Sequence, residues 1–165
     1  MANNVQIDFE GTLFDGVKRT PRFEKGLEEG IKQVAIDVDK DTKEKLEKGR
    51  GFWKGSLYRS ISFSPIVGLG FEVASNPGGR PIQHAEYVEW GRRAGKWPPR
   101  QAIAEWARTH GFTTPSSLFL LQRAIGRRGV KGVHMFRDTA KEWNAKKREI
   151  SRIVGKEVVR ELRRS

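Results

Sequence analysis

The chain has 165 residues, 36% of them hydrophobic, and contains no cysteine, which excludes a thiol nucleophile and a cysteine-ligated zinc site. This length suffices for one domain whose core needs no disulfide or metal. Lys and Arg number 32 against 20 Asp and Glu, a net charge of +12. The N-terminus lacks the basic start and apolar stretch of a signal peptide, and no apolar run approaches the roughly 20 residues of a membrane helix. We therefore expect a soluble protein, made in the cytoplasm, with no membrane partner.

The positive charge is confined to the second half of the sequence. Residues 1–90 contain 13 Lys and Arg and 14 Asp and Glu, a net charge of −1, whereas residues 91–165 contain 19 and 6, a net charge of +13. Such asymmetry favours contact with a polyanion or with an acidic partner surface. A basic helix in solvent explains the same charge without any partner, and composition does not choose between these interpretations.

The beginning of the chain predicts a strand followed by a long helix. Apolar and polar residues alternate over 5–9, as in a half-buried strand. Thr20 and Pro21 are typical of a helix start, with Thr as the cap and Pro in the first turn. Apolar residues three or four positions apart then predict an amphipathic helix over about 21–47, with one face on the core. The glycine-rich segment 49–55 ends it.

Two further alternating segments predict a β-hairpin. Residues 61–63 and 69–73 each alternate large apolar side chains with small or polar ones, and residues 65–68 supply a turn between them. A short helix is predicted over 82–90. The hairpin and the early strand together account for the β-structure that we expect.

The second half predicts helices separated by basic loops. The segment GRRAGKWPP, residues 91–99, is a glycine-rich loop whose final Pro98 and Pro99 begin a helix. Gly111 is a suitable end for that helix, and TTPSS, residues 113–117, begins the next one. A second basic loop, GRRGVKG, follows.

After this loop, apolar residues recur three or four positions apart from Phe136 onward, with one gap at Lys147, and predict one long basic helix. The sequence therefore predicts an α+β fold. A small antiparallel β-sheet packs with an early amphipathic helix, and the helical second half ends in a long basic helix. Residues 1–135 are expected to form a single domain with basic glycine-rich loops. Residues 136–165 are expected to pack on this domain or on a neighbouring subunit.

The sequence offers little for catalysis or metal binding. Its three histidines fall in different predicted elements, and although His84 with Glu86 or Glu89 resembles part of a metal site, no third ligand is evident. Glu86 and Glu89 are spaced for one side of a helix and leave an acid/base hydrolase as an alternative, but cations follow at once and are suited to pair with them. A phosphate loop at residues 91–97 fails because the spacing of its glycines is wrong and Trp97 follows the lysine. We expect no metal, no cofactor and no enzymatic activity.

Nucleic-acid or acidic-partner binding is the better hypothesis. Cations in the two basic loops can neutralise phosphates, and glycine lets a loop approach a backbone closely. No base-reading motif is present, so we expect any contact with DNA to be independent of sequence. The candidate contact residues are Arg92, Arg93, Lys96, Arg127, Arg128 and Lys131. The candidate residues for holding these loops in place are Trp90, Trp97, Pro98, Met135 and Phe136, for which ordinary core packing is the alternative.

Several motifs carry a resemblance when they are taken in order. They are KGSLYRSISF, in which Gly55, Leu57, Ser60 and Ile61 stand out, then AEYVEWG, KWPP, EWARTHGF and LQRAIGRRGVKGVHMFRDT. In this order, over roughly residues 23–143, the chain resembles the tail-completion, or neck (head–tail joining), proteins of long-tailed double-stranded DNA bacteriophages. Two features depart from the family pattern. Tyr87 and Glu89 are closer together than the family motif has them, and the chain beyond Trp143 is longer and more basic.

The resemblance implies a structural virion protein without catalysis. Such proteins are similar to ring-forming subunits, hexameric or alternatively dodecameric, at the junction between the portal vertex of the capsid and the tail. The implied partners are further copies of the chain, the neighbouring connector and tail proteins, and double-stranded DNA that passes without sequence recognition. The six candidate cations then face either DNA in the lumen or an acidic neighbour. The alternative is a basic, non-specific DNA-binding protein that acts as a monomer or dimer.

Overall fold

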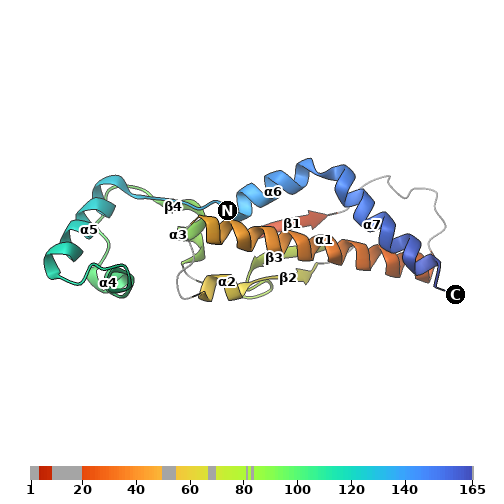
Figure 1. Cartoon of the computed structure of the whole chain (residues 1–165), viewed down its shortest axis with the longest axis horizontal. Helices are drawn as coiled ribbons and strands as arrows, with labels where there is room; N and C mark the ends of the chain where they lie inside the picture. The colour runs from red at the N-terminus through yellow and green to blue at the C-terminus, as the bar shows by residue number, and fades with distance from the viewer. Residues whose placement is uncertain are drawn as a thin grey trace.

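The computed structural model describes residues 4–8, 20–49, 55–66, 70–80, 82 and 84–164 of the chain. Within them the elements are β1 (Asn4–Asp8), α1 (Pro21–Lys48), α2 (Ser56–Ser60), β2 (Ile61–Pro65), β3 (Gly70–Ser75), α3 (Ala85–Trp90), β4 (Gly91–Arg92), α4 (Arg100–Thr109), α5 (Pro115–Arg128), β5 (Val130–Lys131), α6 (Met135–Ala145) and α7 (Lys147–Leu162). This is the predicted α+β fold with a helical second half. The molecule is elongated (Figure 1). Residues 91–131 form an arm that projects from one end, and the other elements form the body.

The early helix begins and ends close to where its local signals predict. The hydroxyl oxygen of Thr20 accepts a hydrogen bond from the backbone N–H of Phe23 at 3.3 Å, and Pro21 occupies the first turn. Its apolar stripe, which includes Leu27, Ile31 and Val34, is buried against the rest of the body. The helix ends at Gly49, and the remainder of the predicted glycine-rich break, residues 50–54, lies outside the described residues.

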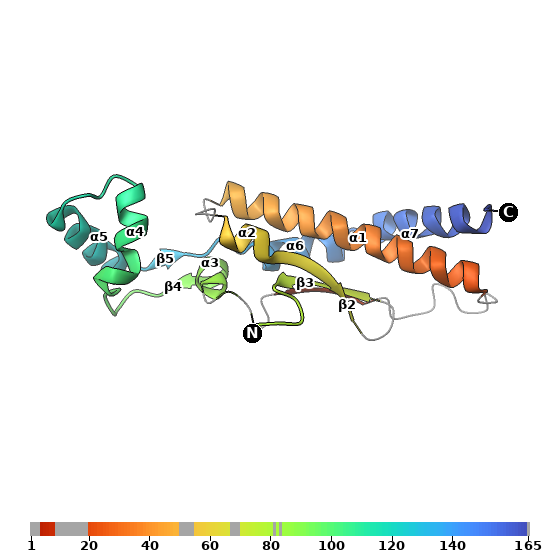
Figure 2. The same ribbon diagram turned by 90° about the horizontal axis from the view of Figure 1, so that it is seen from below.

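Among the described residues, β1, β3 and β2 form an antiparallel sheet in that order. Val73 in the central strand lies opposite Val5 on one side and Phe63 on the other. The predicted hairpin and early strand are therefore confirmed, while position 9 of that strand and most of the predicted turn, residues 67–69, lie outside the described residues. Helix α1 lies across β2 and β3 (Figure 2), and α6 lies next to β1 (Figure 1). The core is formed between the helices and this sheet.

The prediction of one long helix from Phe136 onward was wrong, because the chain forms two helices that meet at Lys146. This residue ends α6 and precedes α7 with ψ of 33°, and its N–H donates to the carbonyl of Trp143 at 3.0 Å. The bend lets α6 lie against the sheet and lets α7 run along α1 (Figure 1). The gap in the apolar pattern at Lys147 was the local sign of this change in direction.

Helix α7 packs closely against α1 of the same chain because two glycines remove side chains from the contact. A Cβ atom on Gly26 would lie 2.7 Å from the Cα of Val158, and one on Gly30 would lie 2.7 Å from the Cα of Val154. Any side chain at these positions would push the two backbones apart. The approach is supplemented by an ion pair between Lys25 and Glu161 at 3.4 Å. The outward face of α7 is therefore held in a fixed position.

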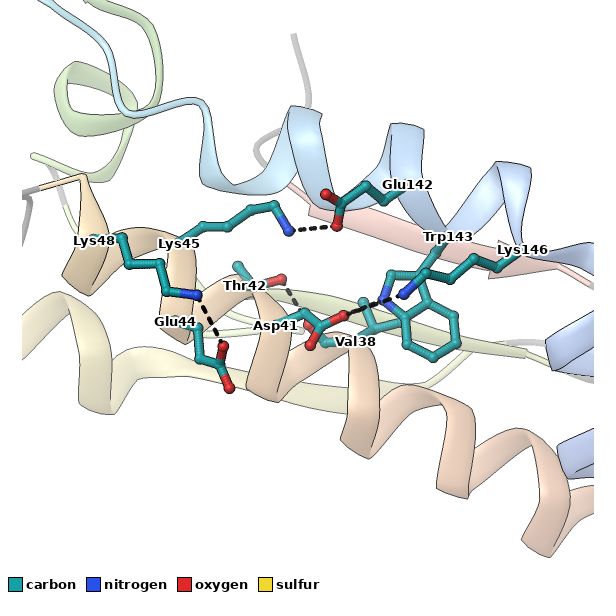
Figure 3. A network of polar contacts seen from close by, with 9 residues as sticks. All are labelled: Val38, Asp41, Thr42, Glu44, Lys45, Lys48, Glu142, Trp143 and Lys146. Atoms are coloured by element: carbon teal, nitrogen blue, oxygen red, sulfur yellow. Dashed lines mark hydrogen bonds and ion pairs between the residues drawn. The ribbon is translucent and has the colours of Figure 1, made fainter.

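A polar network joins α1 to α6 (Figure 3). The indole N–H of the buried Trp143 donates to the Oδ2 atom of Asp41 at 2.9 Å. The ammonium of Lys45 lies 2.6 Å from the Oε2 atom of Glu142, and this hydrogen bond lowers the pKa of Glu142 below its ordinary value. These contacts fix the rotation of α6, so that its apolar face meets the core.

Candidate interaction surface on the arm

The arm begins where two short strands pair. Gly91 lies opposite Lys131 and Arg92 lies opposite Val130, in antiparallel register. The two basic segments were predicted as separate loops. Residues 93–99 do form a loop, but two residues of each segment pair as strands of one ribbon, so the segments are not separate. Arg127 and Arg128 instead occupy the last turn of α5, where cations interact favourably with the helix dipole. The structure therefore brings the candidate cations of both segments to the same region.

Glycine is required in this ribbon because the two backbones approach closely. Gly91 has φ of +76° and Gly129 has φ of +70°, in the region that side chains rarely adopt. A Cβ atom on Gly91 would collide with the carbonyl oxygen of Val130, and one on Gly129 with the carbonyl oxygen of Arg92. The glycines that suggested loops serve to let the two strands of the ribbon approach each other.

The base of the ribbon is fixed to the body by Glu89. Its side chain is 1% exposed, and its two carboxylate oxygens accept hydrogen bonds from the backbone N–H groups of Phe136 at 3.0 Å and Arg137 at 2.9 Å. These groups begin α6, whose preceding residue His134 makes no side-chain cap. A carboxylate at this position accepts hydrogen bonds from N–H groups that have no partner within the helix, and its negative charge interacts favourably with the positive end of the helix dipole. Glu89 thus has a structural role.

The other residues that were candidates for chemistry near Glu89 do not converge on it. Glu86 is exposed on α3. His84 is also exposed at the start of that helix, although partial desolvation of its ring lowers the pKa of the imidazole. In the part of the chain that the structure describes, no group of three or more His, Asp or Glu side chains is arranged to hold a metal ion.

The five residues predicted to hold the basic segments lie in three environments. Met135 and Phe136 are fully buried in the core of the body, at the start of α6. Trp90 is partly exposed and meets His134 edge to face, with ring centroids 5.9 Å apart. Trp97 and Pro98 belong to the arm. Met135, Phe136 and Trp90 therefore support the base of the ribbon, whereas Trp97 and Pro98 support its far end.

The far end of the arm is a helical hairpin of α4 and α5, held together by a few specific contacts. The buried Gln122 donates from Nε2 to the carbonyl oxygen of Pro98 at 2.7 Å and accepts from the Nε–H of Arg100 at 3.1 Å. The ring of Trp97 packs over Gly126, where a Cβ atom would lie 2.8 Å from the indole nitrogen. Trp97 also meets Phe119 edge to face at 5.5 Å. The predicted helix starts at Pro98–Pro99 and TTPSS are confirmed.

Positive charge dominates the arm. Residues 91–131 contain nine Lys and Arg and a single carboxylate, Glu105, a net charge of +8. Of the predicted contact residues, Arg92 is half-buried and donates from Nη2 to the carbonyl oxygen of Lys96 at 2.8 Å, so it also shapes the turn. The other five candidates are exposed, namely Arg93, Lys96, Arg127, Arg128 and Lys131. Among the described residues, none of the six candidates lies within 4.0 Å of a carboxylate.

The arm also leaves large apolar side chains in solvent. Leu120 is 59% exposed, Val130 is 49%, Trp97 is 48% and Phe119 is 40%. Of these residues, Phe119, Leu120 and Val130 were not among the predicted site residues. The run LFLL at 118–121 was the available sign, because four consecutive apolar residues in a helix cannot all face one core. Contiguous exposed apolar patches mark interaction sites, and Trp97 and Phe119, whose rings are in contact, form the start of one on the arm.

No helix in the described ranges is both long and apolar enough to span a bilayer. Comparison with protein-family models, with curated proteins and with solved structures finds no match to this chain.

Proposed function

We propose that the chain is a structural subunit at the head–tail junction of a long-tailed double-stranded DNA bacteriophage, where copies assemble into a ring. The order of the motifs between residues 23 and 143 supports the family. The observation that carries the assembly is the projecting arm, which leaves Trp97, Phe119 and Leu120 in solvent (Figures 1 and 2). An isolated monomer gains nothing from exposing these side chains, whereas an assembly buries them.

A ring requires that one surface of a subunit contacts a different surface of the next one. The arm suits such a contact because it extends away from the body, which leaves it uncovered by the rest of the chain (Figure 1). In this proposal the arm of one copy lies against the body of its neighbour. The apolar side chains supply the burial, and the cations supply orientation through acidic groups on the acceptor surface.

The six candidate cations have two roles within this proposal. They face DNA in the lumen, where they neutralise phosphates without reading bases, or they contact an acidic neighbour in the junction. Both roles require that no carboxylate of the same subunit neutralises the cations, and none of the six forms an ion pair among the described residues. An Arg92→Ser, Arg93→Ser, Lys96→Ser triple variant should fold and should impair joining or DNA retention in phage particles. Full infectivity would exclude these residues as the working surface.

The second candidate function is sequence-independent DNA binding by a monomer or dimer. The excess of nine cations over one carboxylate in the arm favours it. The two functions differ in what happens without DNA. A junction subunit forms a closed oligomer as its concentration rises, whereas the alternative protein stays small and binds random duplex tightly with a steep dependence on salt.

The test is the native mass of the purified chain and of a Phe119→Ser, Leu120→Ser variant over a range of concentrations. We expect a ring for the parent chain and smaller species for the variant, because the contact loses its apolar burial. The matched control is Ile36→Ser, which removes a side chain of α1 that is 40% exposed, like Phe119. A parent chain that never assembles yet binds random DNA contradicts the junction proposal.

A further inference from the structure

The face of α7 that points away from α1 carries cations that the proposal above does not use. Cations recur along α7 at every fourth position, all of them exposed, and because this row winds slowly around the helix, Arg152 and Lys156 point most directly away from the face that Val154 and Val158 turn to α1. They are Arg148, Arg152, Lys156, Arg160 and Arg164. Because an α-helix rises 1.5 Å per residue, the four cations inside α7, from Arg148 to Arg160, extend over about 18 Å, and Arg164 lies just beyond the end of the helix at Leu162. Arg163 adds a further exposed cation near the C-terminal end.

Several of these cations have no partner of opposite charge. Arg160 pairs with Glu157 at 2.8 Å, and Arg164 pairs with Glu161. Among the described residues no carboxylate lies within 4.0 Å of Arg152, Lys156 or Arg163. These three side chains line a shallow surface pocket of about 640 Å³, together with Gly155, Val159, Arg160 and Arg164. The lining contains no acidic residue.

The fold itself does not favour this arrangement. Like charges four residues apart on a helix repel each other, and in the first turn Lys147 and Arg148 outnumber Glu149, which leaves net positive charge next to the positive end of the helix dipole. These effects destabilise an isolated helix. A sequence that retains them breaks a local rule, and such departures occur mainly at functional sites.

Gly155 is a second departure in the same place. Glycine is unfavourable in the interior of a helix, and at Gly26 and Gly30 the close approach of α7 explains it. At Gly155 a Cβ atom would meet nothing within 4 Å, so packing does not require glycine there. The missing side chain leaves space in the middle of the cationic pocket, where the backbone of a ligand can approach the helix.

We infer that the outward face of α7, centred on Arg152, Lys156 and Arg163, binds the phosphate backbone of duplex DNA without recognising its sequence. The cations form a row along a helix that is rigidly held against α1, and a duplex is a linear polyanion with one charge per about 1.7 Å of its axis. The choice of DNA over another linear polyanion rests on the proposed function. This contact is additional to the six candidate cations of the arm.

The test is the binding of a fluorescent duplex of random sequence to the purified full chain between about 50 and 200 mM salt. We compare the parent chain with an Arg152→Gln, Lys156→Gln, Arg163→Gln variant. The variant should bind about tenfold more weakly or worse, and the slope of log K against log salt should fall by about 2 to 3. The matched control is Arg22→Gln, Lys32→Gln, Lys40→Gln, which removes the same charge from exposed positions on α1 and should change affinity about twofold at most.

A second variant tests the geometry without changing charge. Gly155→Leu places a bulky side chain in the pocket and replaces a poor helix former with a good one, so it should raise Tm and still weaken DNA binding. Equal losses for the α7 variant and the α1 control would overturn the inference, because net charge alone would then explain binding. Competition by polyglutamate as strong as that by duplex would also overturn it, in favour of an acidic protein partner. Native mass measured on the same samples reports ring formation separately, so failure of this inference is distinguishable from failure of the proposed function.

Discussion

The body and the arm use their side chains in opposite ways. In the body, large apolar residues from α1, the sheet, α6 and α7 are buried together, and several charged residues of α1 are paired. In the arm, buried side chains are few and cations outnumber carboxylates nine to one. Among the described residues the arm exposes four large apolar side chains, nearly as many as the five exposed by the much larger body. The difference indicates that contacts within the chain stabilise the body, whereas the arm has a composition suited to contacts with another molecule.

The largest expected effect lies in the body, at the contact of α1 with α7. Gly30→Leu should lower the free energy of unfolding by about 3 kcal/mol or more, because a side chain there collides with the backbone at Val154. Chemical denaturation of both proteins measures the difference. Gly155→Leu is the control, since the same substitution meets open space on the outward face of α7. Equal stability of the two variants would refute close packing of α7 on α1.

The next largest effect is expected where the arm joins the body. Glu89→Ala should cost about 2.5 kcal/mol, since it leaves the buried N–H group of Phe136 and the partly buried N–H group of Arg137 without their charged acceptor. Glu86→Ala, three residues earlier and exposed, should change the unfolding free energy by less than about 0.5 kcal/mol. If the two substitutions have the same effect, Glu89 does not cap α6.

A smaller effect, confined to the arm, is expected for Gln122→Ala. The substitution removes the hydrogen bonds to Pro98 and Arg100 and should reduce local stability by about 1 kcal/mol. Hydrogen exchange should accelerate for amides of α4 and α5 and stay unchanged for α1. Acceleration of α1 to the same degree would show that the arm and the body unfold together.

The smallest effect concerns the exposed pair of Lys45 and Glu142. Because its pKa is lower in the folded state, Glu142 stabilises the fold above its unfolded pKa, and this stability is lost as the pH falls through the folded pKa. The pair is exposed and should contribute about 0.3 kcal/mol. Denaturation of Glu142→Gln should therefore match the parent chain at low pH and fall slightly below it at neutral pH. A larger gap at low pH would contradict this sign.

Local signals predicted most of the helices and strands. The Thr20 cap, the two proline-led helix starts in the arm and the alternation around Phe63 and Phe71 each lie within one segment, so they are visible in the sequence. The candidate cations were also recognisable, because their excess is a property of composition. These features need no knowledge of which segments meet.

The ribbon and the cap could not be predicted in this way, because both depend on contacts between distant segments. Each strand of the ribbon has two residues, too few to show alternation, and pairs with a segment far along the chain. Glu89 gave no local sign of its role, since the N–H groups that it binds lie at positions 136 and 137. Glycine suggested loops in both segments, although its actual role is to permit close backbone approach.

The most direct test of whether the arm, and not the body, forms the contact between subunits is the reactivity of a thiol placed on the arm. Because the chain has no cysteine, Leu120→Cys carries a single thiol, which a maleimide reagent labels quickly in the monomer. We predict that labelling slows strongly as concentration rises and the ring forms, while Ile36→Cys, the control in the body, is labelled at the same rate throughout. A thiol at position 120 that stays fully reactive in the assembled protein would contradict the claim that the arm forms the contact between subunits.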